Sequence, residues 1–597
     1  MEQKQQRGQR NIRCLPAALF IALCAGVYAF HAWSLRNEEL PLLIGAVFLL
    51  NVRLLPRMPR IRVSRWIFSL VLSFALPFSF CIGRIAWTED GHFLTGNNLL
   101  VVLTAVPECF LVLVCLSDWL SDLSIPTGRA ARLRPRRVFL VFSAVLFLCW
   151  LPALIFNYPG ILIQDYNWQF SQAQGKITSN QHPVLHTLLI RLCQKLSGAI
   201  FFRGQSAGLQ NTGAVLCNSL IQMVFLALVI GAVLWFFYQR NQVAALIALL
   251  FFGLFPMFQI FSVYMTKDVI FSGLVFLFSF ELYLLFHRDP ESEQKISWKR
   301  TVLFLATAVL TTLFRGNGGA VVVGSCVLLL LLFRKGRKAV RRLLVLAAVL
   351  CCIVMALQTP VLHLFDIEPS ATVESIGVPI NQVSRVVVNH AEDLGDEERE
   401  TIEAVMPLSS IQELYSRRYA DPVKMSSDFN RQVLDENRGT YLRLWIRLFF
   451  EYPRDYVEAW LDLTIGFWYP GVEKGCISYN FTDRDSYYQA FDMNYSTSTA
   501  YEHFITEDVR KNPMEAWLWS PGLAVMAMWF LCLLSFWRQG RREVVVYIPS
   551  VLAWGTLMLA TPSYCETRYI FYVFLCLPMW ILIRIRQKTG EGSLNHG

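Results

Sequence analysis

Residues 215–238 read VLCNSLIQMVFLALVIGAVLWFFY and contain no charged side chain. A helix of about 20 apolar residues is long enough to cross the hydrocarbon core of a bilayer. Comparable runs recur throughout the 597 residues, of which 55% are hydrophobic and 16% charged. A soluble chain carries roughly 25% charged residues, so this composition excludes a water-soluble fold. It predicts an all-α membrane protein that crosses the bilayer many times.

About fourteen spanning helices are expected from these runs. The first run is longer than the roughly 7–15 apolar residues of a signal peptide and leads directly into the second, which indicates a retained anchor. The fourteen runs lie near residues 14–33, 39–52, 66–86, 98–117, 138–157, 215–238, 242–263, 268–287, 300–315, 318–333, 342–359, 517–537, 544–561 and 569–585.

Most basic residues lie in short connections between these runs, which is typical of the cytoplasmic side of a membrane protein. With the N-terminus inside, the Arg-rich connections all fall on one side and both termini are cytoplasmic. The formal net charge of +10 is therefore a topology signal rather than a sign of nucleic-acid binding, with contacts to anionic lipid head groups as a by-product. The cytoplasmic connections are expected at residues 53–65, 118–137, 288–299, 334–341 and 538–543.

Two connections on the opposite side are too long to be simple loops, and the longer one is acidic. Between Pro360 and Pro513 there are 26 Asp and Glu against 14 Lys and Arg, whereas the rest of the chain carries 40 basic and 18 acidic residues. We therefore expect four parts: an N-terminal four-helix transmembrane extension (1–137), a transmembrane module (138–359) with its first outer loop at 158–212, an extracytoplasmic loop domain (360–516), and C-terminal transmembrane helices with a cytoplasmic tail (517–597).

The fifteen cysteines fit neither a disulfide framework nor a zinc site. Most lie inside apolar runs, where Cys behaves as a small hydrophobic residue, and no CxxC pair occurs. Cys476 and Cys565 fall outside the predicted spans, so a disulfide between them is an open alternative, but spacing alone does not establish it.

Residues 158–196, YPGILIQDYNWQFSQAQGKITSNQHPVLHTLLIRLCQKL, hold the most informative polar side chains. Asp165 follows the outer end of a spanning helix by a few residues. His182 precedes Pro183, which suits the first turn of a new helix, and His186 lies one turn later. The plain alternative is that Asp165 is a solvated loop residue and His182 a helix cap.

Charged residues also lie at the outer ends of three later runs. Lys267 and Asp268 open the eighth run, Arg315 closes the ninth, and Glu566 and Arg568 precede the last. Basic residues on the outer side oppose the usual charge bias. Snorkelling to the interface would explain any one of them, but three in short outer connections favour an anion site. A phosphate at the outer membrane surface is the expected ligand.

The order of a spanning helix, an outer Asp, a Gly and a His-Pro helix start resembles the first outer loop of the GT-C glycosyltransferases. That superfamily includes the protein O-mannosyltransferases and the lipid A aminoarabinose transferases. More closely, the stretches YPGILIQDYNWQFSQAQG, SNQHPVLHTLLI, LFRGNG and ETRYIF resemble an uncharacterised family of bacterial membrane proteins placed in that superfamily. The resemblance covers residues 138–585 and leaves out the first four spans. A GT-C-like fold is therefore expected.

The motifs differ from those of the named enzymes at three points. The mannosyltransferases have paired acidic residues, whereas Asp165 has no acidic neighbour. The stretch His182-Pro183 lacks a second proline, and Trp468-Tyr469-Pro470 is not the WWD-type motif of the oligosaccharyltransferases. The donor and acceptor of those relatives are therefore not carried over.

The resemblance implies transfer of a sugar from a polyprenyl-phosphate-linked donor to an extracytoplasmic acceptor at the cell membrane. A phosphate leaving group needs charge neutralisation. The acceptor hydroxyl needs one base, for which Asp165 is the candidate. One carboxylate with a cationic clamp predicts a single displacement with inversion. The other expected roles are donor-phosphate binding by Lys267, Arg315 and Arg568, and substrate binding by His182, His186, Asp268 and Glu566.

Three alternatives stay open. His182 and His186, four residues apart, are half of a metal site with Asp165 as a third ligand, so a divalent metal is an alternative although no metal ligand is assigned. A transporter or lipid flippase for cell-envelope precursors would place charges near the bilayer centre. A structural or sensor protein would bind a cell-wall polymer through residues 360–516. The expected partners are the polyprenyl-phosphate sugar donor, membrane lipids and a cell-envelope glycan, lipid or protein acceptor, and no nucleic acid.

Overall fold

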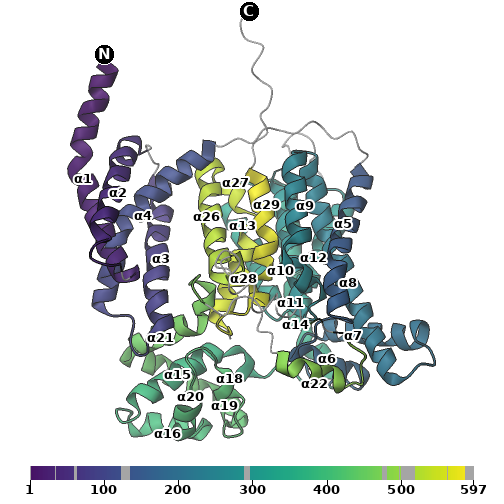
Figure 1. The fold of residues 1–597 in the computed structure, drawn as a ribbon. Coiled ribbons are helices and arrows are strands. Elements are labelled where there is room, and N and C mark those ends of the chain that lie inside the picture. Colours follow the sequence, from purple (N-terminus) through teal and green to yellow (C-terminus); the bar gives the residue numbers. More distant parts are fainter. Residues whose placement is uncertain are drawn as a thin grey trace, which may run out of the picture.

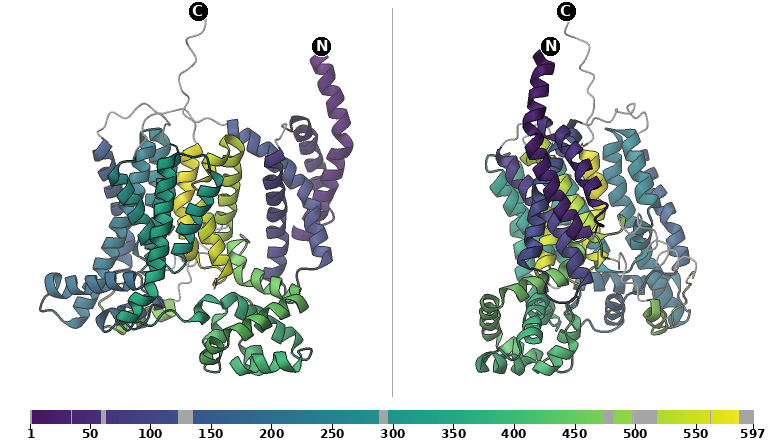
Figure 2. Two further views of the ribbon diagram at one scale, coloured as in Figure 1. Left: turned by 180° about the vertical axis from the view of Figure 1, so that it is seen from behind. Right: turned by 60° about the vertical axis from the view of Figure 1, so that its left-hand side comes forward.

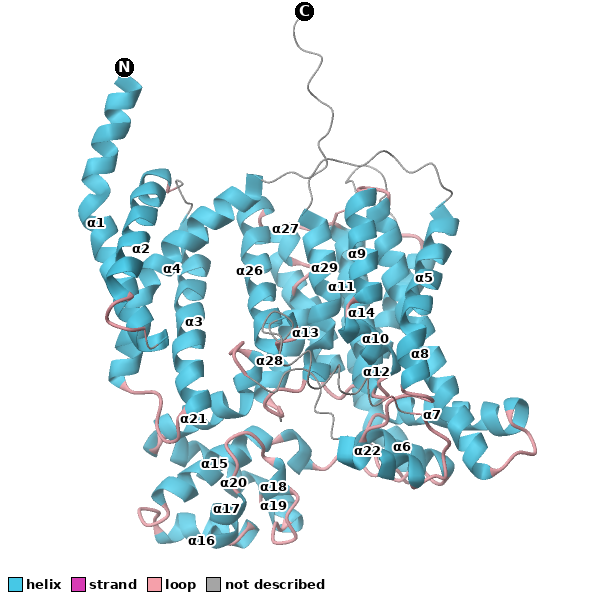
Figure 3. Cartoon of the chain, in the orientation of Figure 1, coloured by secondary structure: helices cyan, strands magenta, loops and turns pink. Residues whose placement is uncertain are grey.

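The computed structural model describes residues 2–58 except 34, 63–122, 135–287, 296–472, 481–496, 498, 518–560 and 562–584. Helices make up nearly all of these residues, and apart from two isolated bridges no strand occurs among them (Figures 1 and 3). Long helices run side by side as a bundle, and shorter helices gather at one end of it (Figure 2). The protein is thus an all-α, multi-pass membrane protein.

The helices fall into three groups. Four N-terminal helices form one side of the bundle: α1 (Glu2–Trp33), α2 (Leu40–Leu54), α3 (Val63–Thr88) and α4 (Gly96–Asp122). The rest of the bundle consists of α5 (Pro135–Phe156), α8 (Ala207–Tyr238), α9 (Gln242–Leu254), α10 (Pro256–Val263), α11 (Lys267–Phe286), α12 (Trp298–Phe314), α13 (Gly318–Leu332), α14 (Lys338–Leu364), α26 (Pro521–Gln539), α27 (Arg541–Val544), α28 (Ile548–Leu559) and α29 (Phe571–Arg584). The helices at one end are α6 (Gln164–Gln174), α7 (Val184–Leu196), α15 (Gly377–His390), α16 (Asp396–Val405), α17 (Leu408–Leu414), α18 (Asp421–Lys424), α19 (Arg431–Glu436), α20 (Arg438–Glu451), α21 (Pro453–Thr464) and α22 (Phe481–Gln489).

The number of full-length spans differs from the expected fourteen. Nine of the predicted runs are helices long and apolar enough to cross a membrane. A further run forms the pair α9 and α10, which is bent by 56° before Pro256. Proline cannot continue the hydrogen-bond ladder of the preceding helix, which accounts for the break. The remaining four runs form α12, α13, α26 and α28, which are too short or too polar within the described residues to count as full spans.

A tenth helix of sufficient length, Val184–Phe201, lies in the segment expected to be an outer loop. It comprises α7 and a following turn of π-helix, and it runs along the end of the bundle rather than among the parallel helices (Figures 1 and 2). One face is buried and packs on α8, whereas Leu188, Leu192, Ile200 and Phe201 are exposed. This one-sided apolar pattern suits a helix lying in the membrane interface.

Helices α15–α21, called here the outer domain, have a hydrophobic core of their own. Its centre includes Val386, Ile402, Leu434 and Leu448, none of which is more than 2% exposed. In Figure 1 the outer domain lies at the same end of the bundle as α6, α7 and α22. Helix α1 begins and α29 ends at the opposite end. The helix that carries Asp165 and the outer domain are therefore on one side of the spanning helices.

A break between α10 and α11 connects two distant parts of the chain. Residues 264–266 leave the helix, and their backbone pairs with the segment before α6. Ile161 N donates to Val263 O at 2.8 Å, and Met265 N donates to Ile161 O at 2.9 Å. These two hydrogen bonds place the start of α11 beside the start of α6.

The side-chain amide of Gln222, on α8, supports this break. Carbonyl groups at the end of a helix have no partner inside it, and in a membrane bundle water does not supply one. The buried Gln222 Nε2 lies 3.1 Å from Phe261 O, 3.1 Å from Ser262 O and 3.0 Å from Tyr264 O, so its two N–H groups are shared among these three carbonyls. Gln222 thereby supplies hydrogen-bond donors to carbonyl groups at and just after the end of α10.

We expect Gln222→Leu to destabilise the protein, because buried carbonyl groups would lose their donor. An unsatisfied buried polar group costs about 1–3 kcal/mol in the free energy of unfolding. Denaturant unfolding in detergent micelles measures this change. Gln239→Leu, at the exposed end of the same helix, is the matched control. An equal loss in both variants would contradict the role given to Gln222.

Candidate functional site

Seven ionisable side chains meet where α6, α11, the end of α12 and the turn before α29 come together. Lys267 and Asp268 belong to the first turn of α11, and Arg315 follows the last residue of α12. All residues predicted for the site except His186 are among the seven. We call this set the Asp165 cluster: Asp165, His182, Lys267, Asp268, Arg315, Glu566 and Arg568.

Asp165 makes two ion pairs through one oxygen atom. Its Oδ2 lies 3.4 Å from Lys267 Nζ and 3.0 Å from Arg568 Nη1. Burial by itself would raise the pKa of Asp165, but the positive charges of Lys267 and Arg568 outweigh burial and hold the pKa of this carboxyl well below its usual value. Asp165 is therefore ionised throughout the physiological range.

Asp268 is the buried anchor of the cluster. Its side chain is 1% exposed, and Oδ1 lies 3.1 Å from Arg315 Nη1. Its Oδ2 accepts a hydrogen bond from Thr266 Oγ1 at 3.1 Å and lies 3.8 Å from Arg568 Nη1. A carboxylate in the first turn of a helix also interacts favourably with the helix dipole. Asp268 thus fixes both arginines relative to the start of α11.

Arg568 is the common partner of three carboxylates. Besides Asp165 and Asp268, it contacts Glu566, with its Nε 3.2 Å from Oε2. Its Cζ also lies 5.0 Å from the ring centroid of Tyr569, and Arg315 Cζ lies at the same distance from that ring. Tyr569 therefore contributes a cation–π contact to both guanidinium groups.

The cluster is electrically balanced and only partly accessible. Its three cations face three carboxylates, so the formal charges cancel when His182 is neutral. The side chain of Asp165 is 29% exposed, whereas those of the other five are exposed by 15% or less. Among these six, a ligand that approaches the cluster therefore meets Asp165 first.

His182 holds the Lys267 ammonium in place. Lys267 Nζ lies 2.6 Å from His182 Nδ1, so the ammonium donates and Nδ1 carries no proton. Burial and the charge of Lys267 lower the pKa of His182 to about 4, although Asp165 acts in the opposite direction. The imidazole is therefore neutral near pH 7.

His186 lies apart from the ion pairs. It is fully buried, with Nδ1 2.9 Å from Gln169 Oε1 and its ring edge-on to Tyr166 and Phe314. Gln169 uses its Nε2 to donate to Thr187, so its Oε1 accepts and His186 Nδ1 carries the proton. Among the described residues no hydrogen bond joins His186 to Asp165, and its substrate contact stays a prediction.

The half metal site that the two histidines suggested is not formed. Helix α7 begins at Val184, so His182 precedes the helix and points to Lys267, whereas His186 is on the helix and points to Gln169. In the part of the chain that the structure describes, no group of three His, Cys, Asp or Glu side chains is placed to hold a metal ion. The Cys476–Cys565 disulfide, which the sequence left as an open alternative, lies outside the described residues because Cys476 is not among them.

Three residues that contact the predicted site residues were not expected from the sequence. Thr266 caps α11, since its Oγ1 accepts from Asp268 N at 3.3 Å, and a Thr directly before a helix with an Asp in its first turn is a recognisable cap. Tyr569 directly follows Arg568, so its place in the chain was an available signal. No sequence signal points to Gln169, because its contact with His186 depends on the packing of α6 against α7.

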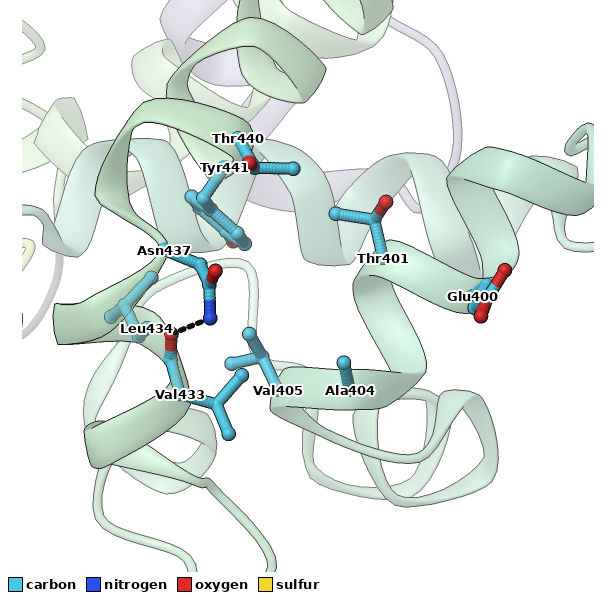
Figure 4. A pocket seen from close by; sticks show the side chains of 9 residues that line it. All are labelled: Glu400, Thr401, Ala404, Val405, Val433, Leu434, Asn437, Thr440 and Tyr441. Carbon is cyan, nitrogen blue, oxygen red and sulfur yellow. Dashed lines mark hydrogen bonds between the residues drawn. The ribbon is translucent and has the colours of Figure 1, made fainter.

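A cavity of about 260 Å³ lies in the outer domain rather than at the Asp165 cluster. Figure 4 shows it between α16 and the helices α19 and α20, with Tyr441 and Asn437 facing Thr401 and Ala404. Its lining shares no residue with the Asp165 cluster. This cavity therefore does not enlarge the candidate site.

The low pKa of His182 predicts a pH dependence of stability. The unfolded imidazole, with a pKa of 6.5, binds a proton between pH 6.5 and 4, whereas the folded one does not. Lowering the pH through this window should therefore destabilise the wild type, by up to about 3 kcal/mol from this group. His182→Gln should lose less stability over the same window when unfolding is followed in detergent. Identical pH profiles for both proteins would contradict this assignment.

The profile of the Family of unknown function (DUF6020) matches residues 170–595, which include α7 and every member of the Asp165 cluster except Asp165 itself. Neither a curated protein nor a solved structure matches the chain. Because the matched region spans well over half of the sequence, the chain belongs to the family of unknown function DUF6020.

Proposed function

We propose that the protein is a membrane glycosyltransferase that moves a sugar from a polyprenyl-phosphate-linked donor to an extracytoplasmic acceptor. The Asp165 cluster is its active site. The observation that carries the proposal is the contact of an accessible carboxylate with Lys267 and Arg568, at 3.4 and 3.0 Å. A base and an anion-binding pair lie within a few ångströms of each other, which is what transfer from a phosphate leaving group requires.

The reaction forms one bond and breaks one. The acceptor oxygen attacks the anomeric carbon of the sugar, and its proton passes to the carboxylate of Asp165. The bond from the anomeric carbon to the phosphate oxygen breaks, and both electrons go to the phosphate. Lys267 and Arg568 neutralise the polyprenyl phosphate that leaves. Attack opposite the leaving group inverts the anomeric configuration.

The balanced charge of the cluster couples donor binding to the strength of the base. Each cation already has a carboxylate partner, so a donor phosphate must compete with one of them. When the phosphate draws Lys267 and Arg568 away from Asp165, the charges that lower the pKa of Asp165 are removed. Asp165 then becomes a stronger base at the moment when the donor is in place.

Arg315 and Glu566 have supporting roles in this scheme. Arg315 pairs with the buried Asp268, so it holds the start of α11 and adds positive potential rather than contacting the phosphate first. Glu566 is 13% exposed and pairs with Arg568. It is the carboxylate that keeps Arg568 oriented after the phosphate has displaced Asp165.

We place this end of the bundle outside the cytoplasm. Helix α13 begins next to Arg315 and ends at Leu332, so the basic connection 333–337 lies at the opposite end. Short basic connections favour the cytoplasmic side. Helix α1 begins and α29 ends at that same opposite end (Figure 1), which supports our proposal that both termini face the cytoplasm and that the protein lies in the cell membrane.

A transporter or lipid flippase for cell-envelope precursors is the second candidate, and two observations favour it. The pair α9 and α10 is a broken helix of the kind found in transporters. Glu281 is 5% exposed and lies about four turns along α11 from Lys267. The sequence interpretation placed the relevant charges at the ends of the spans and overlooked this residue. Ionisable residues inside spans mark transport pathways in many proteins.

We expect Asp165→Asn to lower turnover by about 10²–10⁴-fold, because the acceptor hydroxyl loses its base. Proteoliposomes are given radiolabelled polyprenyl-phosphate sugars and a cell-envelope extract as the acceptor. Release of polyprenyl phosphate and the chemical form of the label are measured. A transporter would move the label across the bilayer with the sugar–phosphate bond intact, so the products separate the two candidates.

Asp366→Asn is the matched control for this experiment. Asp366 also pairs with a lysine, Lys176, but its side chain is 83% exposed and outside the cluster. It should retain wild-type turnover. Equal turnover by the wild type and Asp165→Asn would remove Asp165 from the chemistry.

A further inference from the structure

Other parts of the chain contact the turn that carries Glu566 and Arg568 at one residue, Tyr564. Residues 562–566 connect α28 to the short helix Thr567–Ile570 that precedes α29. Tyr564 is 6% exposed and lies only two residues before Glu566 and four before Arg568. A displacement of Tyr564 is therefore passed on to both members of the Asp165 cluster.

The short helix Ile465–Phe467, which follows the outer domain directly, contacts the backbone of this turn closely. Gly466 N, just after α21, donates to Tyr564 O at 2.7 Å. A Cβ atom on Gly466 would lie 2.2 Å from Tyr564 O and 2.7 Å from the Cα of Cys565. These are rigid backbone atoms, so only glycine permits the approach. The turn is thus in direct backbone contact with the segment that immediately follows the outer domain.

The ring of Tyr564 lies between the N-terminal helices and the outer domain. Trp87, near the end of α3, stacks on it with ring centroids 6.0 Å apart and planes inclined by 25°. Tyr419, between α17 and α18, meets it edge-on at 5.1 Å. Arg418 Cζ in turn lies 4.9 Å from the ring of Trp87. Trp87 and Tyr419, which are more than 300 residues apart in the sequence, therefore both pack against the ring of Tyr564.

Buried charges fix the end of α3 to the outer domain. Arg417 and Arg418 donate to Ala86 O at 3.0 and 2.7 Å. Both also pair with the fully buried carboxylate of Asp462, at 2.9 and 2.8 Å. Arginine forms several directed hydrogen bonds at once, which suits such a junction.

Glu458 of α21 adds a second attachment just beyond α3. Its buried carboxylate accepts from Phe93 N and Leu94 N at 2.9 and 2.8 Å and contacts His92 Nδ1 at 2.7 Å. Arg385 Nη2 lies 2.6 Å from the same carboxylate. Separating the partners of a buried ion pair leaves an uncompensated buried charge and is strongly destabilising. These ion pairs therefore resist movement of the residues after α3 relative to α21. Trp87 is therefore held at a fixed position over Tyr564.

We propose that Trp87, Tyr419 and Gly466 are positioning residues that fix the turn from which Arg568 reaches the donor-phosphate position beside Asp165. Through them, the helices α1–α4 and the outer domain act on the Asp165 cluster, although α1–α4 lie before the residues matched by the family profile. The geometric part of this proposal stands by itself, and its effect on turnover rests on the proposed function. Loss of the stack lets the turn shift, which weakens the grip of Arg568 on the donor phosphate.

The test compares Trp87→Ala, Trp87→Phe and Trp66→Ala in the full-length protein. Trp66 lies on the same helix, is 51% exposed and is the matched control. Hydrogen–deuterium exchange of residues 562–570 should rise at least about tenfold in Trp87→Ala and stay near wild type in the other two variants. In the turnover assay, kcat/KM for the lipid-linked donor should fall about tenfold or more through KM in Trp87→Ala alone. Tyr419→Ala, at a side chain 37% exposed, carries the test if Trp87→Ala does not fold.

Each other outcome overturns a stated part of the proposal. Unchanged exchange in Trp87→Ala shows that the stack does not hold the turn. An equal effect in Trp66→Ala shows general destabilisation instead of a specific contact. An equal effect in Trp87→Phe shows that an aromatic ring stacked on Tyr564 is not what holds the turn. Raised exchange with unchanged KM for the donor shows that the turn does not position Arg568 for binding. If the wild type has no transferase activity, the proposed function fails while the exchange data still decide the geometric claim.

Discussion

Six charges are buried or half-buried at one end of a membrane bundle, and each of them must be paired. Removing an ion from water into a protein interior costs several kcal/mol, and partners with good geometry offset this cost. Arg568 meets the requirement for three carboxylates at once, since a planar guanidinium presents five donors. Its contact with Asp165 joins positions 403 residues apart. The packing of α6, α11, α12 and the turn before α29 is therefore fixed by charge compensation.

This constraint also explains why so much structure surrounds a small site. The position of the turn before α29 depends on contacts with Gly466 and Trp87, which meet it at Tyr564. The start of α11 depends in the same way on Gln222 and on the backbone pairing of Ile161. Apart from Ile161 and Tyr564, these supporting groups lie on elements that carry no member of the Asp165 cluster. A cluster without net charge keeps its geometry only while those supports hold.

The sequence was sufficient for most of the helices and for the gathering of charged residues at one end of the bundle, because both follow from apolar runs and their order. The contact between Arg315 and Asp268 depends on how α12 packs beside α11, and no local sequence pattern predicts that packing. The length of the helix Val184–Phe201 was not expected, because its apolar residues lie on one face and do not form a continuous apolar run. Glu281 and Arg385 gave no signal, since a single charge within an apolar or Val-rich stretch does not reveal its partners. Four of the fourteen apolar runs form helices that are too short or too polar to count as full spans, which accounts for most of the difference between the expected and observed numbers.

The most direct test of the central claim is whether the cluster binds the phosphate of a polyprenyl carrier. Thermal unfolding of the purified protein is followed with decaprenyl phosphate or with decaprenol, which has the same chain without the charge. The account predicts that decaprenyl phosphate raises the unfolding midpoint of the wild type and of Arg203→Gln, an exposed arginine at the same end. It should not do so for Arg568→Gln, and decaprenol should have no effect on any of them. Equal stabilisation by both lipids, or an unchanged response of Arg568→Gln, would contradict the account.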